Sequence, residues 1–120
     1  GNPKGVVTHH RGAYLNALSN IVSWEMSFFS RYLWTLPLFH CNGWCFPWSL
    51  AANANVNICL RNVRFEKILQ NIKENKVTHY CGAPVVHNLI LTSLEQMELI
   101  LDPRIKGMVA GAAPPKKCIH

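Results

Sequence analysis

The chain has 120 residues, of which 49% are hydrophobic and 15% charged, a composition that fits one globular core and excludes a disordered chain. No apolar run reaches the roughly 18 residues that a membrane helix needs, so no membrane span is expected. The net charge of +6 comes from basic residues spread along the whole chain without a run of five, which argues against a nucleic-acid partner.

The first half of the chain is expected to alternate between helices and strands. Apolar residues recur at helical spacing before residue 28, and residues 31–37 are rich in aromatic and β-compatible side chains. Pro47 is tolerated in a helix because it lies near the first turn. The expected elements are a helix over 10–28, a strand over 31–37, a helix over 43–54 and a strand over 56–60.

The second half continues the same alternation. An amphipathic helical stripe is formed by Phe65, Ile68, Leu69 and Ile72. The elements expected after it are a strand over 77–83, a helix marked by Val86, Ile90, Leu94 and Met97, and a strand over 106–112. Strands separated by helices are typical of βαβ units, so the predicted fold class is α/β, with a parallel sheet and helices on its faces.

Three loops follow predicted strands, over residues 37–43, 82–85 and 111–115. The carboxyl ends of parallel strands lie together, and open α/β sheets bind their ligands there. The three loops are therefore expected on one side of the sheet, close enough to form a site.

The chain starts with a segment that combines flexible backbone and positive charge: Gly1, Asn2, Pro3, Lys4 and Gly5. Glycines let backbone N–H groups approach an anion, and the lysine adds a cation. The segment is not a Walker loop, because it has no Gly-Lys-Ser/Thr sequence. Considered alone, it is weak evidence for an anion site, and a surface turn explains it more simply.

His40 lies just beyond the strand that ends at Pro37. An imidazole can donate a hydrogen bond to a carboxylate, and its flat ring can act as a gate. A histidine in a loop is also commonly a polar group that its surroundings satisfy. The aromatic residues near it are candidates either for an apolar wall or for ordinary core: Phe39, Trp44, Phe46 and Trp48.

The last predicted strand ends in small residues, namely Gly111, Ala112, Ala113, Pro114 and Pro115. Small side chains allow a flat ligand such as adenine to lie against the backbone. By itself this run is also compatible with a simple turn.

The chain has five cysteines: Cys41, Cys45, Cys59, Cys81 and Cys118. Their odd number, and the lack of an apolar signal segment, favour reduced thiols in a cytosol-like compartment. The closely spaced Cys41 and Cys45 beside His40 raise the question of a metal site. No second ligand pair follows, so buried thiols are expected and no metal ligands are predicted.

Four segments, in order and spacing, resemble motifs of the adenylate-forming (AMP-binding) superfamily of acyl-CoA synthetases, luciferases and peptide-synthetase adenylation domains. GNPKGVV (1–7) resembles half of its phosphate loop, PLFHCNG (37–43) its histidine gate, VTHYCGAPVV (77–86) the strand and loop before the acyl pocket, and GAAPP (111–115) the adenine-side loop. The run over residues 32–48 is particularly similar to bacterial and plant synthetases for short, medium or aromatic acids, including methylmercaptopropionate.

The resemblance implies an ATP-dependent acyl-CoA synthetase that converts a carboxylic acid to an acyl-adenylate and then to acyl-CoA. ATP and coenzyme A would be its substrates, with Mg²⁺ bound by residues outside this chain. Lys4 and its neighbours would hold the phosphates, and His40 would orient the carboxylate and gate the thiol. The implied acyl pocket comprises Trp44, Gly82, Val85 and Val86. The implied adenine and acyl contacts are Gly111, Ala112, Ala113 and Pro114.

The resemblance also implies that residues 1–120 are part of a large N-terminal AMP-binding domain, truncated at both ends. The Ser/Thr half of the phosphate loop, the Tyr-Gly-x-Thr-Glu motif and the C-terminal catalytic lysine do not occur in this sequence. The isolated chain is therefore expected to be inactive, and a non-catalytic α/β module stays the alternative. A cytoplasmic location is expected, or a peroxisomal one in a eukaryote.

Overall fold

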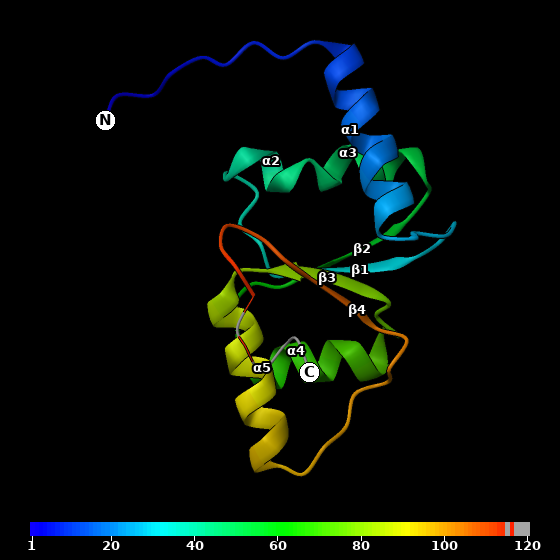
Figure 1. The fold of residues 1–120 in the computed structure, drawn as a ribbon, viewed down its shortest axis with the longest axis vertical. Helices are drawn as coiled ribbons and strands as arrows, with labels where there is room; N and C mark the ends of the chain where they lie inside the picture. The colour runs from blue at the N-terminus through cyan, green and yellow to red at the C-terminus, as the bar shows by residue number, and fades with distance from the viewer. Residues whose placement is uncertain (115, 117–120) are drawn as a thin grey trace.

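The computed structural model describes residues 1–114 and residue 116, and it has an α/β fold (Figure 1). Each helix and strand expected from the sequence has a counterpart, although most are shorter than expected. In chain order the elements are α1 (His10–Ser23), β1 (Arg31–Trp34), α2 (Cys41–Trp44), α3 (Phe46–Ala52), β2 (Val56–Cys59), α4 (Phe65–Glu74), β3 (His79–Gly82), α5 (Pro84–Gln96) and β4 (Lys106–Val109). Pro115 and Cys118 lie outside the described residues.

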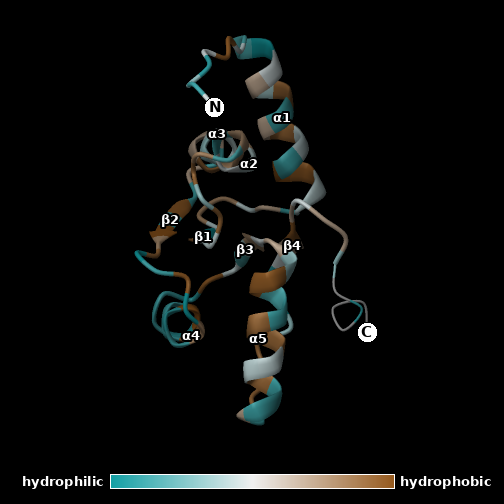
Figure 2. Ribbon diagram, turned by 90° about the vertical axis from the view of Figure 1, so that its left-hand side faces the viewer, coloured by the Kyte–Doolittle hydropathy of each residue, from teal (hydrophilic) through white to brown (hydrophobic). Residues whose placement is uncertain are grey.

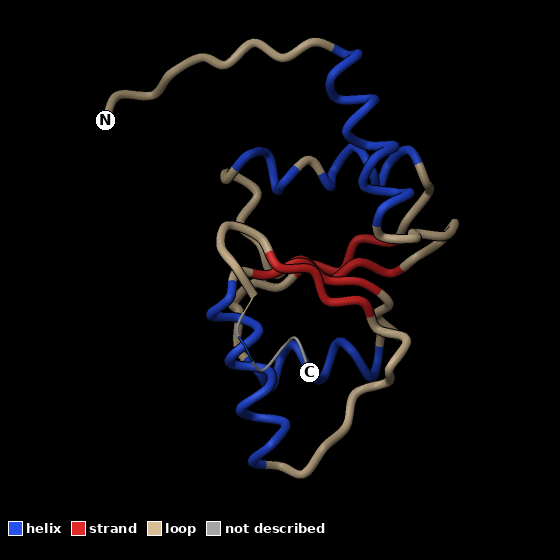
Figure 3. Tube along the Cα trace, in the orientation of Figure 1, coloured by secondary structure: helices blue, strands red, loops and turns tan. Residues whose placement is uncertain are grey.

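The four strands form one sheet in the order β2-β1-β3-β4, and all three pairings are parallel. The predicted parallel βαβ arrangement is therefore confirmed. In the register, Leu33 of β1 lies opposite Ile58 on one side and Tyr80 on the other. The strands form the central layer in Figure 3. Because they run in the same direction, the sheet has a carboxyl end, where Trp34 and Gly82 lie, and an amino end, where Arg31 and His79 lie.

Helices cover both faces of the sheet: α1, α2 and α3 lie on one face, and α4 and α5 lie on the other (Figures 1 and 3). Side chains alternate along β1, so its residues serve two cores. Tyr32 and Trp34 pack with Phe46 on the α3 face, and Leu33 packs with Ile68 of α4 on the other. Figure 2 shows the apolar residues of the helices on both sides of the strands.

Helix α1 ends earlier than the expected helix over residues 10–28. Its last residue is Ser23, and Glu25 has a positive φ of 49°, which stops the helix. Met26 then turns into the core, where it is 4% exposed, and its N–H donates to the carbonyl of Ile21. The apolar stripe on which the prediction rested does not face the sheet, because Leu15 and Val22 are exposed.

No helix in residues 1–114 and 116 is long and apolar enough to cross a membrane.

Candidate functional site at the carboxyl end of the sheet

The three loops predicted to carry a site lie at the carboxyl end of the sheet. The loop with His40 follows β1, the loop from Gly82 follows β3, and the loop from Gly111 follows β4. Two hydrogen bonds join these strand ends. The Thr35 hydroxyl donates to the carbonyl of Cys81 at 2.5 Å, and the Ala110 N–H donates to the carbonyl of Gly82 at 3.0 Å. The sequence reasoning therefore predicted the common location of these loops correctly.

His40 presents an exposed imidazole at this end of the sheet. Its backbone carbonyl accepts from the N–H groups of Gly43 at 2.8 Å and Trp44 at 3.3 Å. Within the described part of the chain, its ring has no hydrogen-bond partner and contacts the ring of Phe39, with 4.6 Å between centroids. The backbone around His40 is thus fixed by hydrogen bonds, while both ring nitrogens are free to meet a ligand.

The residues after His40 form a left-handed turn, which the sequence reasoning missed. The φ angles of the five consecutive residues Cys41–Cys45 all lie between 44° and 63°. This turn splits the helix expected over 43–54 into α2 and α3. Left-handed backbone is costly for residues with a Cβ, so neighbouring contacts must hold it. The only hint in the sequence is the pair Asn42-Gly43, two residue types that tolerate this conformation.

Two contacts anchor the left-handed turn. Gly43 packs on the indole of Trp34 so closely that a Cβ on Gly43 would lie 2.8 Å from the ring. The indole itself is held in place, because its N–H donates to the side-chain oxygen of Asn57 at 2.7 Å. The side chain of Asn20 donates to the carbonyl of Trp44 at 3.4 Å. The turn after His40 therefore rests on the sheet below it and on α1 beside it.

The aromatic residues near His40 divide between core and surface. Phe46 is 3% exposed and stacks on Tyr32, with 4.8 Å between ring centroids, so it belongs to the core. Phe39 is exposed, and Trp44 is partly exposed at 39%. Among these residues, Phe39 and Trp44 are therefore the ones with surface to offer a ligand.

The three residues at and after the end of β3 that were predicted to shape the acyl pocket lie in different environments. Val86 is buried, and it packs with the apolar residues beneath α4 and α5. Val85 is 71% exposed. Gly82 is enclosed, since a Cβ there would lie 3.1 Å from Val86 and 3.3 Å from the Thr35 hydroxyl. The backbone of Gly82 is thus fixed, and Val85 offers the side chain that is open to solvent.

The loop after β4 leaves its backbone accessible. Gly111 has a φ of +86°, which favours glycine, and no other atom would lie within 4 Å of a Cβ placed there. Residues 112–114 are exposed. The loop therefore has the open, small-residue surface that a flat ligand requires.

The structure does not bring the first five residues to the strand ends. Residues 1–9 form an extended segment that leads away from the body of the fold (Figure 1), and residues 1–5 are exposed. The next residues of this segment, Val7–His9, line a hollow of about 420 Å³ together with Cys41, Cys45 and Trp48. Residues 7–9 of the segment therefore lie beside the left-handed turn, whereas Lys4 is exposed to solvent.

The described cysteines, Cys41, Cys45, Cys59 and Cys81, are all free thiols, but the expectation that they are buried is wrong for Cys41 and Cys59, which are exposed. Burial raises the pKa of the Cys81 thiol to about 12, so it stays protonated. Burial, and the nearby Cys41, also raise the pKa of Cys45. Within residues 1–114 and 116, no three His, Cys, Asp or Glu side chains come together in a group that could hold a metal ion.

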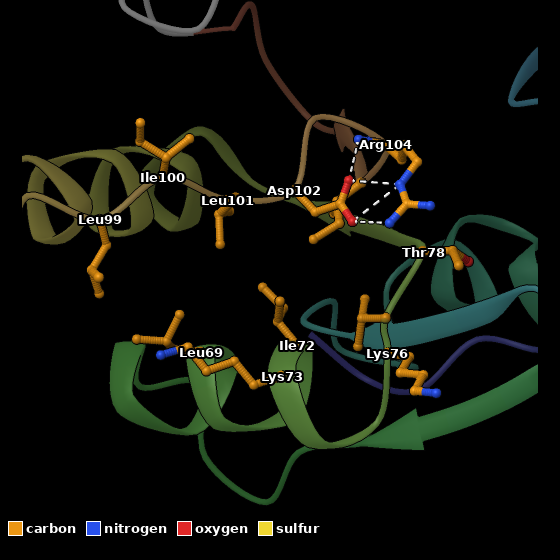
Figure 4. A pocket seen from close by; sticks show the side chains of 12 residues that line it. Leu69, Ile72, Lys73, Lys76, Thr78, Leu99, Ile100, Leu101, Asp102 and Arg104 are labelled. Atoms are coloured by element: carbon orange, nitrogen blue, oxygen red, sulfur yellow. Dashed lines mark hydrogen bonds and ion pairs between the residues drawn. The ribbon is translucent and has the colours of Figure 1, made fainter.

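A larger hollow of about 660 Å³ lies at the amino end of the sheet, between α4 and residues 99–105. Leu69 and Ile72 of α4 face Leu101 across it (Figure 4). Hydrogen bonds from Arg104 hold the pKa of the Asp102 carboxyl at about 2. None of the predicted site residues lines this hollow. We place the candidate site at the carboxyl end because parallel α/β sheets gather their loops there.

The fold is that of an open parallel α/β sheet, a class of protein whose ligands bind at the carboxyl ends of the strands. The family model for AMP-binding enzymes matches residues 1–120, so this chain belongs to the AMP-binding enzyme family.

Curated relatives match almost the whole chain. It is 53% identical over 115 residues to the peroxisomal acetate/butyrate–CoA ligase AAE7 of Arabidopsis thaliana, and 44% identical over 117 residues to the peroxisomal trans-cinnamate:CoA ligase of Petunia hybrida. These matches cover 95% and 98% of the chain and 20% of each relative. The chain therefore spans about a fifth of the length of these curated relatives.

A solved structure has the same fold. The N-terminal domain of FACL13 from Mycobacterium tuberculosis, crystallised with an inhibitor, matches with a TM-score of 0.84 and 26% identity, over 99% of this chain and 30% of that one. The arrangement of strands and loops described above is thus that of part of an N-terminal domain in this family.

Proposed function

We propose that the protein carrying this chain is an AMP-forming acyl-CoA ligase. The observation that carries this proposal is the match to the AMP-binding family over all 120 residues, combined with the three loops at the carboxyl end of the sheet. The chain would supply part of the large N-terminal domain, and residues outside it would complete the site. By itself the chain would be inactive.

The proposed reaction has two steps. A carboxylate oxygen attacks the α-phosphorus of ATP, and the bond to the leaving pyrophosphate breaks, which gives an acyl-adenylate. The sulfur of coenzyme A then attacks the acyl carbon, AMP leaves, and the thiol proton is released. Both steps need a fixed geometry and neutralisation of charge on the phosphates.

His40 would orient the carboxylate in the first step. Its exposed ring has no hydrogen-bond partner within residues 1–114 and 116, and its backbone is fixed by Gly43 and Trp44. A donor fixed in this way costs little reorganisation when it stabilises a transition state. Its ring would also act as the gate through which the thiol enters.

The other loops would hold the remaining groups of the substrates. The partly exposed Trp44 and the exposed Val85 would contact the acyl chain, with Gly82 and Val86 supporting the loop from beneath. The backbone from Gly111 to Pro114 would lie against adenine. Lys4 and the rest of residues 1–5 would hold the β- and γ-phosphates. In the conformation described here that segment lies in solvent, so it would have to close over the nucleotide.

ATP, coenzyme A and a small carboxylic acid would be the partners, with no nucleic acid involved. Structures of the O-succinylbenzoate CoA synthetase of Bacillus subtilis, whose fold is similar, contain AMP, or ATP with a magnesium ion. Magnesium would share the charge of the phosphates. Its ligands would come from residues outside this chain, as the resemblance to the family implies. The acid would be short or aromatic, as the names of the relatives suggest.

Location is part of the same proposal. A cytosolic protein is expected, or a peroxisomal one if the host is a eukaryote. The description of several plant relatives as peroxisomal supports the second possibility.

Substitution of His40 tests the proposed function in the full-length protein. His40→Ala should slow acyl-adenylate formation about 10- to 1,000-fold, because a fixed donor is worth about 2–4 kcal/mol in a transition state. His40→Phe keeps a flat ring without a donor, so it should behave like alanine if donation matters and recover activity if gating alone matters. The measurement is single-turnover pyrophosphate release, normalised to the folded fraction.

His10→Ala is the matched control, since His10 is an exposed histidine at the start of α1 and belongs to none of the three site loops. It should leave pyrophosphate release unchanged. Wild-type rates in both His40 variants would remove His40 from the site. A wild-type protein that releases no acid-dependent pyrophosphate would overturn the proposed function itself.

A further inference from the structure

Two threonine hydroxyls join the neighbouring strands β1 and β3, one at each end. At the carboxyl end, the Thr35 hydroxyl donates to the carbonyl of Cys81 at 2.5 Å, and Thr35 is 5% exposed. At the amino end, the Thr78 hydroxyl accepts from the N–H of Arg31 at 2.9 Å. Both hydroxyls therefore connect the same two strands, Thr35 as a donor at the carboxyl end and Thr78 as an acceptor at the amino end.

The side chain of Thr35 bonds β3 just beyond the last backbone pair between β1 and β3. The paired residues of the two strands end at Trp34 and Cys81. Pro37 has no N–H, so it cannot add a backbone bond as the chain turns towards His40. The side chain of Thr35 thus supplies the last described bond from β1 to β3 before the loop begins.

The contacts of Thr35 lie where the site loops meet. Its hydroxyl oxygen would lie 3.3 Å from a Cβ on Gly82, so it is packed directly against the start of the loop after β3. The carbonyl of Gly82 in turn accepts from the N–H of Ala110, which precedes the loop after β4. A displacement of the Cys81–Gly82 backbone would therefore move the start of two loops relative to His40.

We propose that Thr35 is a positioning residue for the adenylation site: its buried bond to Cys81 sets the separation between the His40 loop and the loop from Gly82. Thr35 does not touch a substrate. It keeps the donor of one loop and the acyl-binding surface of the next at the spacing that the carboxylate needs. This inference rests on the proposed function.

The test compares three variants of the full-length protein. Thr35→Val removes the hydroxyl while preserving the shape of the side chain, and it leaves the buried carbonyl of Cys81 without this donor. Thr35→Ser keeps the hydroxyl. Thr78→Val, the control, removes the hydroxyl that connects the strands at the amino end of the sheet, together with its bond to His79.

Thr35→Val should raise the KM for the carboxylic acid about tenfold, since misplacement of reacting groups and loss of a buried hydrogen bond have effects of this order. The KM for ATP should rise less than the KM for the acid, because residues 1–5 would hold the phosphates and only the adenine-side loop after β4 would shift. Thr35→Ser should restore the acid KM. Thr78→Val should lower the melting temperature without moving the acid KM.

Equal acid KM values in Thr35→Val and wild type would overturn the role of Thr35 while leaving the proposed function intact. The same result would follow if Thr78→Val raised the acid KM as much as Thr35→Val did, or if Thr35→Ser failed to restore it. A wild-type protein without acid-dependent pyrophosphate release would overturn the proposed function and, with it, this role.

Discussion

The two parts of the candidate site are held in place very differently. The loops after β1, β3 and β4 start from paired strands, and the bonds of Thr35 and Ala110 join their bases. Residues 1–5, by contrast, are exposed and lie in an extended segment away from the sheet. Neither Gly1 nor Gly5 has an atom within 4 Å of a Cβ placed on it. The contacts of the sheet therefore fix the three loops of the candidate site without a ligand. Residues 1–5 have no such contacts, so another group must position them.

This difference separates two kinds of mutational effect. Substitutions in the loops of the sheet should act on stability as well as on catalysis, because those loops share contacts with the core. Substitutions in residues 1–5 should act on nucleotide binding alone. A segment that orders only around its ligand loses conformational entropy on binding, so it also lowers the affinity that its contacts could otherwise give.

Gly43→Ala should produce the largest loss of stability in the sheet-held half. Gly43 has a φ of 62°, and a Cβ there would lie 2.8 Å from the ring of Trp34. Backbone strain and overpacking together should destabilise the fold by about 2–4 kcal/mol. The measurement is the shift of the denaturant midpoint of the full-length protein.

Gly111→Ala is the matched control for Gly43→Ala. Gly111 also has a positive φ, of 86°, but a Cβ there would meet no atom within 4 Å. It should therefore lose only the conformational term, about 1 kcal/mol. If the two variants lost equal stability, packing on Trp34 would not be what holds the left-handed turn.

Lys4→Ala should have its effect on nucleotide binding and none on stability. Loss of one charge-assisted phosphate contact is worth about 1.5–3 kcal/mol, so the KM for ATP should rise roughly 10- to 150-fold. The melting temperature without ligand should not change, because residues 1–5 make no described contact with the core. Steady-state kinetics and thermal melts of the same samples measure both quantities. An unchanged KM for ATP would show that residues 1–5 are an ordinary surface turn without a role in phosphate binding.

The sequence predicted the sheet but not the turn that follows His40. Periodicity and proline positions predict the parallel α/β fold, because they depend on short-range patterns that survive in the structure. The left-handed turn depends on Gly43 packing against Trp34, and on the side chain of Asn20 reaching Trp44. These contacts join residues far apart in the chain, so no local pattern signals them. The role of Val86 in the acyl pocket stays a prediction, and its burial in the core, in the first turn of α5, was not visible in the sequence.

A smaller effect is expected at the amino end of the sheet, where His79 joins the connection after α1 to β3. One ring nitrogen of His79 faces the carbonyl of Trp24 at 3.0 Å, and the other faces the hydroxyl of Thr78 at 2.8 Å. The carbonyl can only accept, so the nitrogen facing it donates, and the other nitrogen accepts from the hydroxyl. The neutral ring therefore satisfies both partners.

Burial lowers the pKa of His79 below its ordinary value of 6.5, and the positive charge of Lys106 lowers it further, while the bond to Trp24 acts in the opposite direction. As the pH falls through 6.5, the unfolded chain takes up a proton before the folded one. The stability that neutral His79 contributes is thus present above pH 6.5 and is lost as the pH falls through the lowered pKa.

His79→Gln keeps a donor but cannot ionise. Between about pH 8 and about pH 5, the melting temperature of the wild type should fall further than that of the variant. His10→Gln, an exposed histidine substitution on α1, should melt in parallel with the wild type. Parallel curves for His79→Gln would show that the buried ring does not couple stability to pH.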